Sequence, residues 1–210
     1  MENIKFEDFH YSTLPNEEEE NIIGDAFKVI FLGDISVGKT NLMTRFSSDT
    51  FSINSKATIG VDVAAKSVKL GPYLFRLQLW DTSGQERYKS FTAAYFKDAN
   101  GVIFVYDITH RPSFDHIQSW YQLGLDGTSA NKVAMMLVGN KRDCQAKREV
   151  SQAEGEDFAK KLGVPFFETS ALDNLNQCVG RAFFGLVMSG LIRHYYNQTS
   201  ERSDVSIECP

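Results

Sequence analysis

Six short apolar runs of β type lie along the middle of the chain, with helix-type segments between them. Four of the runs are nearly continuous in apolar residues, which is typical of strands buried on both faces of a sheet. These four runs are 27–32, 102–106, 133–138 and 165–167. The pattern predicts a mostly parallel sheet whose two faces are both covered by other elements.

The other two runs, 61–70 and 73–80, alternate partly between apolar and polar residues, and Gly71 and Pro72 separate them. Alternation indicates one exposed face, and a glycine with a proline between two runs indicates a turn. We therefore expect these two runs to form a hairpin with one more exposed edge.

The segments between the strands carry helix signals. Residues 41–46 follow the first strand and its loop as a helix, and residues 151–162 begin with Ser151 and Glu154 in capping-box spacing. Residues 175–194 place apolar side chains at helical spacing. Together these elements predict an α/β fold, a doubly wound and mostly parallel six-stranded sheet with helices on both faces. Ligands of such sheets bind beyond the carboxyl ends of the strands.

Domain organisation follows from where the apolar runs stop. Residues 1–25, which include the acidic run Glu17 to Glu20, are expected to be a flexible acidic extension. Residues 26–194 form the one folded domain that 210 residues with 42% hydrophobic content allow. Residues 195–210 are polar and are expected to be a flexible tail.

Charge and cysteine content exclude some classes of function. The net charge of −5 argues against a protein that binds nucleic acid. Cys144, Cys178 and Cys209 are far apart and lack metal-type spacing, so they are interpreted as free thiols in a reducing compartment. The first residues do not resemble a secretion signal, and no apolar run approaches the length of a membrane span. A cytoplasmic location is the expectation.

The first strand runs directly into a phosphate-loop motif. Residues 33–40 read GDISVGKT, which matches the GxxxxGK[ST] pattern. The glycines let backbone N–H groups surround a phosphate chain, and the following helix points its positive end at the same phosphates. The alternative, a glycine-rich turn with an incidental lysine, fits this placement poorly. The residues of this segment that are predicted to bind the nucleotide are Asp34, Ile35, Ser36, Val37, Gly38, Lys39, Thr40 and Asn41.

A second motif follows the third strand and suits a metal ion and a terminal phosphate. Asp81 is predicted to hold Mg²⁺ together with the hydroxyl of Thr40. Gly84 offers an unobstructed N–H to a γ-phosphate, and Gln85 can orient a water molecule. Thr58 is predicted to complete the metal shell, although by itself it has the pattern of an ordinary threonine at the start of a strand.

Two later loops are predicted to recognise a purine base. Residues 140–143 read NKRD, and the carboxylate of Asp143 can accept hydrogen bonds from N1 and the 2-amino group of guanine, which adenine cannot supply. Asn140 would meet N7, and the aliphatic stem of Lys141 would cover one face of the ring. The N–H of Ala171 would meet the guanine O6. Taken alone, the tetrapeptide has the alternative interpretation of a charged surface loop.

The motifs GDISVGKT, TIGVD, WDTSGQE, NKRD and ETSAL, in this order, resemble those of the Ras-like small GTPases. The stretches IGVDV, LQLWDTSGQERYKSF, AYFKDA and VYDIT are similar to the Rab branch, and the resemblance spans 27–194. It implies binding of GTP and GDP with Mg²⁺, with Gln85 and Lys39 as catalytic residues. It implies a guanine site formed by Phe51, Asn140, Lys141, Asp143, Ser170, Ala171 and Leu172.

The resemblance also implies a role in vesicle trafficking on the cytosolic face of endomembranes. The expected partners are exchange factors, GTPase-activating proteins and effectors, with peripheral contact to membranes and a monomeric state. Nothing in the composition by itself indicates these partners.

The chain departs from the family pattern in its phosphate loop and its tail. Ile35 stands where the family has a small residue, and a bulky β-branched side chain beside the γ-phosphate could obstruct Gln85 or an inserted arginine, so slow hydrolysis is the hypothesis. The alternative is that Ile35 turns into solvent. Val63 replaces a phenylalanine of the effector face. Cys209 lies outside a C-a-a-X box, so it is either lipidated irregularly or an ordinary thiol.

Three functions follow from these features. The first is a cycling GTPase, and the second is a nucleotide-loaded binding module that hardly hydrolyses GTP, for which Ile35 is the argument. The third, an adenine-specific kinase or ATPase with a phosphate loop, is disfavoured by the NKRD and ETSAL loops.

Overall fold

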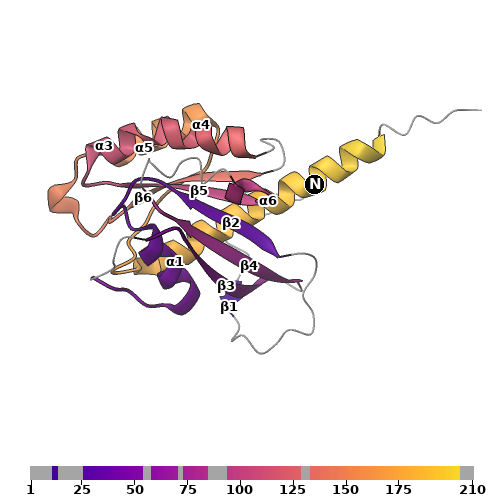
Figure 1. Cartoon of the computed structure of the whole chain (residues 1–210), viewed down its shortest axis with the longest axis horizontal. Coiled ribbons are helices and arrows are strands. Elements are labelled where there is room, and N and C mark those ends of the chain that lie inside the picture. Colours follow the sequence, from indigo (N-terminus) through magenta and orange to yellow (C-terminus); the bar gives the residue numbers. More distant parts are fainter. Residues whose placement is uncertain are drawn as a thin grey trace, which may run out of the picture.

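The structure is a computed structural model that describes residues 11–13, 26–53, 58–70, 73–84, 94–128 and 133–203. Its sheet contains all six predicted strands, in the order β3-β4-β2-β5-β6-β7 (Figure 1). The strands β2, β4, β5, β6 and β7 run parallel, and β3 runs antiparallel to β4. The predicted doubly wound, mostly parallel sheet is confirmed. The strands are β2 (Phe27–Leu32), β3 (Val61–Leu70), β4 (Tyr73–Thr82), β5 (Gly101–Asp107), β6 (Ala134–Asn140) and β7 (Phe166–Glu168).

A seventh, short strand extends the sheet beyond the six predicted ones. The strand β1 (Tyr11–Thr13) pairs antiparallel with β3 at the edge of the sheet, with Tyr11 opposite Leu70. These residues belong to the segment that was expected to be an extension without structure. Tyr11–Thr13 reads YST and contains no run of consecutive apolar residues, so no sequence pattern marked it as a strand.

Helices cover both faces of the sheet. The helices α1 (Lys39–Ser48) and α6 (Cys178–Ser203) lie on one face, and α3 (Arg111–Asp115), α4 (Ile117–Gly127) and α5 (Gln152–Leu162) lie on the other (Figure 1). Short 3-10 turns lie at Ala94–Phe96, Gln145–Lys147 and Leu175–Gln177.

Alternate residues of β2 serve the two layers of the core. Val29 and Phe31 pack in the cluster formed with α1 and α6, whereas Ile30 and Leu32 pack in the cluster formed with α4 and α5. Successive side chains of a strand point to opposite faces, so a strand between two helical layers must be apolar at every position. This is why β2 reads as a continuous apolar run.

The ends of two helices test the local predictions. Ser151 and Glu154 form the predicted capping box, and Gly163 ends α5 in the left-handed conformation with φ of 69°. The helix α6 begins later than expected, after a 3-10 turn, and continues to Ser203 rather than ending at His194. Its last turns project away from the sheet (Figure 1). Residues 195–203 contain neither glycine nor proline, so no local signal ends the helix there.

Candidate functional site

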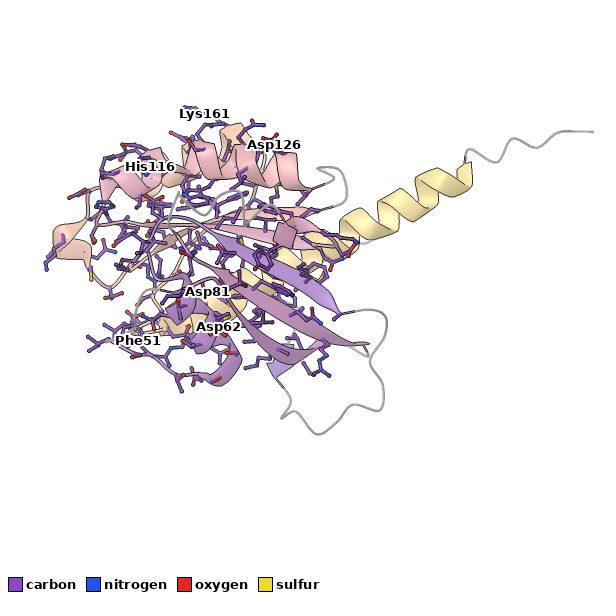
Figure 2. All side chains as sticks on the ribbon, viewed as in Figure 1. Phe51, Asp62, Asp81, His116, Asp126 and Lys161 are labelled. Carbon is purple, nitrogen blue, oxygen red and sulfur yellow. The ribbon has the colours of Figure 1, made fainter. Side chains whose placement is uncertain are left out.

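A pocket of about 420 Å³ lies at the carboxyl ends of the strands, where the loops after β2, β4, β6 and β7 meet. Figure 2 shows the side chain of Asp81 at the end of β4, with Phe51 further toward the same end of the molecule. Most of the predicted site residues line this pocket. They are Ile35, Ser36, Gly38, Lys39, Thr40, Asn41, Phe51, Thr58, Gly84, Asn140, Lys141, Asp143, Ala171 and Leu172.

The phosphate loop is shaped by contacts with the loop after β6. Gly38 has φ of 98°, and a Cβ atom added there would lie 2.4 Å from Nδ2 of Asn140. The same Nδ2 donates to the carbonyl of Val37 at 2.9 Å, and Asn140 is buried. Only glycine fits this approach, so Asn140 stabilises the loop that precedes α1.

Lys39, the first residue of α1, is a buried cation. Its Nζ donates to the carbonyls of Gly33 and Asp34, both at 2.8 Å. Burial lowers the pKa of Lys39 to about 8, against the opposing effect of the charges on Asp81 and Asp34. A triphosphate beside this ammonium would favour its charged form.

Two hydroxyl groups and one carboxylate meet beneath the phosphate loop. Thr40 Oγ1 donates to Asp81 Oδ2 at 2.5 Å, and Thr58 Oγ1 donates to the same oxygen at 3.0 Å. The two hydroxyl oxygens are 3.0 Å apart. The predicted metal ligands therefore come together from α1, from the start of β3 and from the end of β4.

The second oxygen of Asp81 shows that this cluster suits a cation. Asp81 is fully buried, and in the described part of the chain its Oδ1 has no hydrogen-bond partner. Burial raises the pKa of Asp81, while the hydrogen bond from Thr40 and the charge of Lys39 oppose the rise. A buried carboxylate oxygen without a partner is costly. A bound Mg²⁺ would remove that cost, and Mg²⁺ is commonly held by one or two carboxylates and substrate phosphates.

The cluster is not an all-protein metal cage. Over the described ranges, no group of three or more His, Cys, Asp or Glu residues could hold a metal ion. The fit with Mg²⁺ therefore depends on the hydroxyls of Thr40 and Thr58 and on oxygen atoms that a phosphate chain would bring.

The carboxylate of Asp143 is exposed at the other end of the pocket and is held by its neighbours. Ser170 Oγ donates to Asp143 Oδ1 at 2.6 Å, and Cys144 Sγ donates to Oδ2 at 3.2 Å. Burial raises the pKa of Asp143, but these two hydrogen bonds, a backbone hydrogen bond and the charge of Lys141 together leave it below its ordinary value. Asp143 is thus an ionised acceptor whose orientation is set by the loop after β7.

Lys141 joins the base end of the pocket to the phosphate loop. It adopts a positive φ of 66°, its Nζ donates to the carbonyl of Ser36 at 2.9 Å, and it pairs with Asp107 Oδ2 at 2.6 Å. With its end anchored in this way, the aliphatic stem of Lys141 lies along the pocket as the base-covering role requires.

Ile35 and Gly84 meet at the phosphate end. Ile35 lines the pocket and leaves 46% of its surface exposed, so its side chain is directed at neither core cluster. A Cβ atom on Gly84 would lie 2.2 Å from the backbone nitrogen of Ile35 and 2.3 Å from the carbonyl carbon of Asp34. A side chain at position 84 would therefore collide with the phosphate loop.

Some predicted site residues do not line the pocket. The carboxylate of Asp34 faces α4, where it accepts from Trp120 Nε1 and contacts His116 Nδ1, each at 2.7 Å. Its side chain is therefore engaged away from the pocket, and only its backbone borders Lys39. Val37 and Ser170 are buried behind the lining, and Ser170 acts through Asp143. Gln85 lies outside the described residues.

Ile53, Thr82 and Cys144 line the pocket without having been predicted. Thr82 lies inside the second motif and donates to the carbonyl of Phe31 at 2.7 Å. Cys144 directly follows Asp143, and Ile53 lies two positions after Phe51. In the sequence, the only indication that these three residues belong to the pocket was their position within or next to residues already predicted for the site.

Within the residues that the structure describes, none of the helices combines the length and the apolar character that crossing a bilayer requires.

Comparison with known proteins identifies the family. The model of the Ras family matches residues 28–190. The chain is 44% identical over 161 residues to the Ras-related protein RABA6b of Arabidopsis thaliana, an alignment that covers 77% of this chain and 69% of that protein. It is 46% identical over 161 residues to the Ras-related protein Rab-12 of Mus musculus, covering 76% of this chain and 65% of that protein. The chain belongs to the Ras family and is a small GTPase of its Rab branch.

Proposed function

We propose that the pocket binds GTP and GDP with Mg²⁺, and that the chain acts as a molecular switch in intracellular vesicle trafficking. The observation that carries this proposal is that Lys39 and Asp143, residues of separate motifs, line one pocket of about 420 Å³. A buried cation at one end suits phosphates, and an ionised acceptor at the other suits the N1 and 2-amino edge of guanine.

Each group has a defined task in the proposed hydrolysis. Lys39 and the N–H groups of the phosphate loop stabilise negative charge that develops on the phosphates. Thr40, Thr58 and Asp81 would hold Mg²⁺, and that ion would supply further neutralisation of the charge on the phosphates. Gln85 is assigned to orient the attacking water from its place in the motif alone.

Slow hydrolysis is the second part of the proposal. Ile35 presents an exposed β-branched side chain at the phosphate end of the pocket, beside the backbone contact with Gly84. This position supports an obstruction of Gln85 or of an arginine that a GTPase-activating protein inserts. The competing function, a GTP-loaded binding module with almost no turnover, differs only in how severe that obstruction is.

Effector contact is proposed for the surface near the start of β3. Ile59 and Val63 expose 94% and 48% of their surface, and Ile59 directly follows Thr58 of the metal cluster. A triphosphate that orders Thr58 would also order this apolar surface, which gives the switch a readout.

A competition experiment tests the nucleotide assignment. The purified chain is loaded with labelled GDP and challenged with GTP, ATP and XTP. We expect GTP to compete at least about a hundredfold better than ATP, because adenine leaves the acceptor of Asp143 unpaired. Asp143→Asn should lose GTP preference and gain XTP binding, because the amide can donate to the C2 carbonyl of xanthine. Equal competition by ATP and GTP would overturn the proposal.

A further inference from the structure

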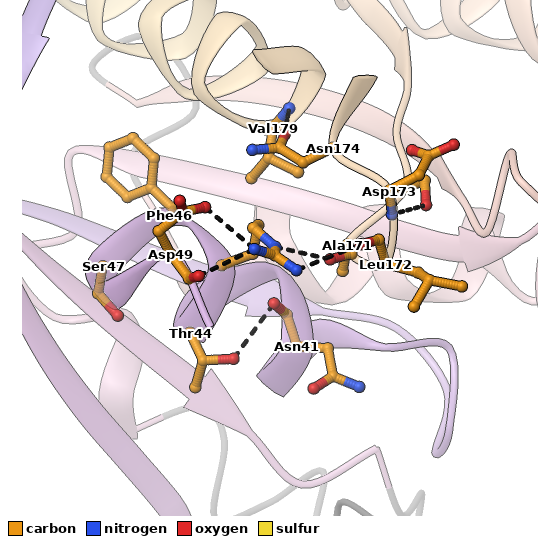
Figure 3. A network of polar contacts seen from close by, with 12 residues as sticks. Asn41, Thr44, Phe46, Ser47, Asp49, Ala171, Leu172, Asp173, Asn174 and Val179 are labelled. Atoms are coloured by element: carbon orange, nitrogen blue, oxygen red, sulfur yellow. Dashed lines mark hydrogen bonds and ion pairs between the residues drawn. The ribbon is translucent and has the colours of Figure 1, made fainter. Parts of the chain in front are cut away.

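Arg45 lies on α1, six residues beyond Lys39, and connects that helix to the loop after β7. Its Nε donates to the carbonyl of Ala171 at 2.7 Å, and its NH2 donates to the carbonyl of Leu172 at 3.2 Å. On the other side its NH1 donates to the carbonyl and to Oδ1 of Asp49, at 2.9 and 3.0 Å. Figure 3 shows Asp49 on one side of this network and Ala171 and Leu172 on the other.

Hydrogen bonds among the residues of the loop itself hold the part of the loop up to Ser170. Asn174 N–H donates to the carbonyl of Ser170 at 3.0 Å, which fixes the peptide group that carries the Ala171 N–H. Ser170 Oγ accepts from the N–H of Asp173 at 3.1 Å and donates to Asp143 at 2.6 Å. The next two carbonyls, those of Ala171 and Leu172, are the ones that Arg45 holds.

The forked shape of the guanidinium explains why arginine suits this position. Its planar N–H groups leave in fixed directions, so one side chain can bind two successive carbonyls. The side chain of Arg45 is only 15% exposed, whereas that of Asp49 is 78% exposed. An exposed ion pair contributes little by itself, so the bonds to the loop after β7 are the important ones.

We propose that Arg45 is a positioning residue for guanine recognition. By binding the carbonyl of Ala171, it fixes the peptide group that carries the Leu172 N–H, directly after the Ala171 N–H assigned to O6. By binding the carbonyl of Leu172, it fixes the peptide group whose N–H donates to Ser170 Oγ. It thereby joins the base end of the pocket to the helix that starts at the phosphate end. This inference rests on the proposed guanine-nucleotide site.

The experiment compares GDP with 6-thioguanosine diphosphate, which keeps the N1–H and 2-amino donors read by Asp143 but carries sulfur in place of O6. Relative affinities are measured by competition against labelled GDP, for the wild type and for Arg45→Met. The wild type should prefer GDP by about tenfold or more, because sulfur is larger than oxygen and a weaker acceptor, so it leaves the loop N–H groups poorly paired. In Arg45→Met the ratio of the GDP affinity to the analogue affinity should fall by about threefold or more. The reason is that Arg45 and the contact at position 6 of the base are coupled, so their effects are not additive.

Two variants serve as controls. Thr44→Ala removes a hydroxyl of α1 that, among the described residues, bonds to the carbonyl of Asn41 in its own helix at 3.3 Å. Asp49→Asn removes the exposed ion pair while leaving the fork in place. Both should keep the wild-type preference. If Arg45→Met does not fold, Arg45→Lys takes its place, because one ammonium cannot reproduce the fork and the preference should still fall.

The outcomes separate the inference from the proposed function. If the arginine variant weakens GDP and the analogue by the same factor, or leaves both unchanged, Arg45 does not position the loop for O6 and the inference is overturned. If the wild type itself binds both nucleotides equally, the proposed guanine site fails first.

Discussion

Two buried polar side chains of the site, Asp81 and Asn140, bond to partners from other parts of the chain. Asp81 receives hydroxyl groups from Thr40 and Thr58, and Asn140 bonds to the phosphate loop through Val37. Buried polar groups must be paired, and breaking such pairs costs more than forming them contributes. At the scale of single residues, the site is therefore a set of mutually dependent groups rather than independent ligands.

Ile35 gives the first prediction at this scale. Ile35→Ser should raise the single-turnover rate of GTP hydrolysis by about tenfold or more, because a small side chain clears the space beside the γ-phosphate. The rate is followed as phosphate release from protein preloaded with GTP. Ile53→Ser is the matched control, since it removes another exposed isoleucine that lines the pocket but lies outside the phosphate loop. Equal rates for wild type and Ile35→Ser would contradict the idea of slow turnover.

Lys39 gives a pH-dependent prediction. Its pKa is about 8 in the nucleotide-free fold, so above that pH a growing fraction of the protein must take up a proton when phosphate binds. The affinity for GDP should be constant below pH 8 and fall by up to about tenfold per pH unit above it. Lys39→Arg stays protonated, so its affinity, although weaker, should show a smaller slope. The guanine base also titrates, but it does so equally with both proteins. If the wild type and Lys39→Arg show identical slopes, the assignment of the slope to Lys39 is refuted.

The same shift has a consequence for stability, with the opposite sign. The ordinary pKa of lysine is 10.5, so the unfolded side chain binds its proton more tightly than the folded one. Between about pH 8 and 10.5 the unfolded chain therefore carries more protons, and this group makes the nucleotide-free fold more stable as the pH rises.

At the scale of elements, α1 has contacts at both ends of the pocket. It starts at Lys39 and carries Arg45, and its last carbonyls accept from Lys66 of β3, with Nζ 2.7 Å from the carbonyl of Phe46. The ring of Phe46 stacks on that of Phe183 in α6, with centroids 3.9 Å apart. The helix is thus tied to the sheet, to α6 and to the loop after β7, which makes it a stable support for phosphate and base contacts.

The start of α5 allows a prediction about an element alone. Ser151→Ala removes the capping-box hydroxyl that accepts from the N–H of Glu154 at 3.2 Å. The free energy of unfolding should fall by about 1 kcal/mol, measured by urea denaturation of the GDP-bound protein. Gln152→Ala removes an exposed hydrogen bond to Glu156. It should lower the free energy of unfolding by no more than a few tenths of a kcal/mol. A cost for Ser151→Ala as small as that of the control would show that the cap contributes nothing.

At the scale of the whole molecule, the strand order collects the motifs. The strands β4, β2, β5, β6 and β7 are parallel neighbours in the sheet. The loops that follow β2, β4, β6 and β7 therefore lie at the same edge. Parallel strands end at the same edge of a sheet, so residues as distant in sequence as Thr40 and Asp81 or Asp143 and Ser170 come into contact.

Removal of Mg²⁺ tests the coupling between this site and the whole fold. The metal cluster draws on α1, β3 and β4, so chelation by EDTA should lower the Tm of the GDP-bound protein by roughly 5–10 °C and speed the release of GDP. Differential scanning calorimetry measures the first effect, and labelled GDP the second. Asp81→Asn should have lost most of this dependence, and a Tm unaffected by EDTA in the wild type would count against the metal site.

Much of this protein was determined by local sequence. Apolar runs of the right length became the strands, because a strand buried on both faces must be apolar throughout. The capping pair at Ser151 and the glycine of the phosphate loop could also be predicted locally, because the backbone conformation at each position restricts which residue fits there. The motif order also located most of the pocket lining.

Only the tertiary structure decided how distant residues meet. Asp34 was predicted to bind the nucleotide as part of the phosphate loop, but its carboxylate accepts from Trp120, which is 86 positions away, and Arg45 reaches a carbonyl 126 positions away. The edge strand β1 and the pocket residue Cys144 likewise depend on neighbours that no local pattern names. Hydrogen bonds and packing act over a few ångströms in space, so they remain invisible in sequence until the sheet has set which segments are adjacent.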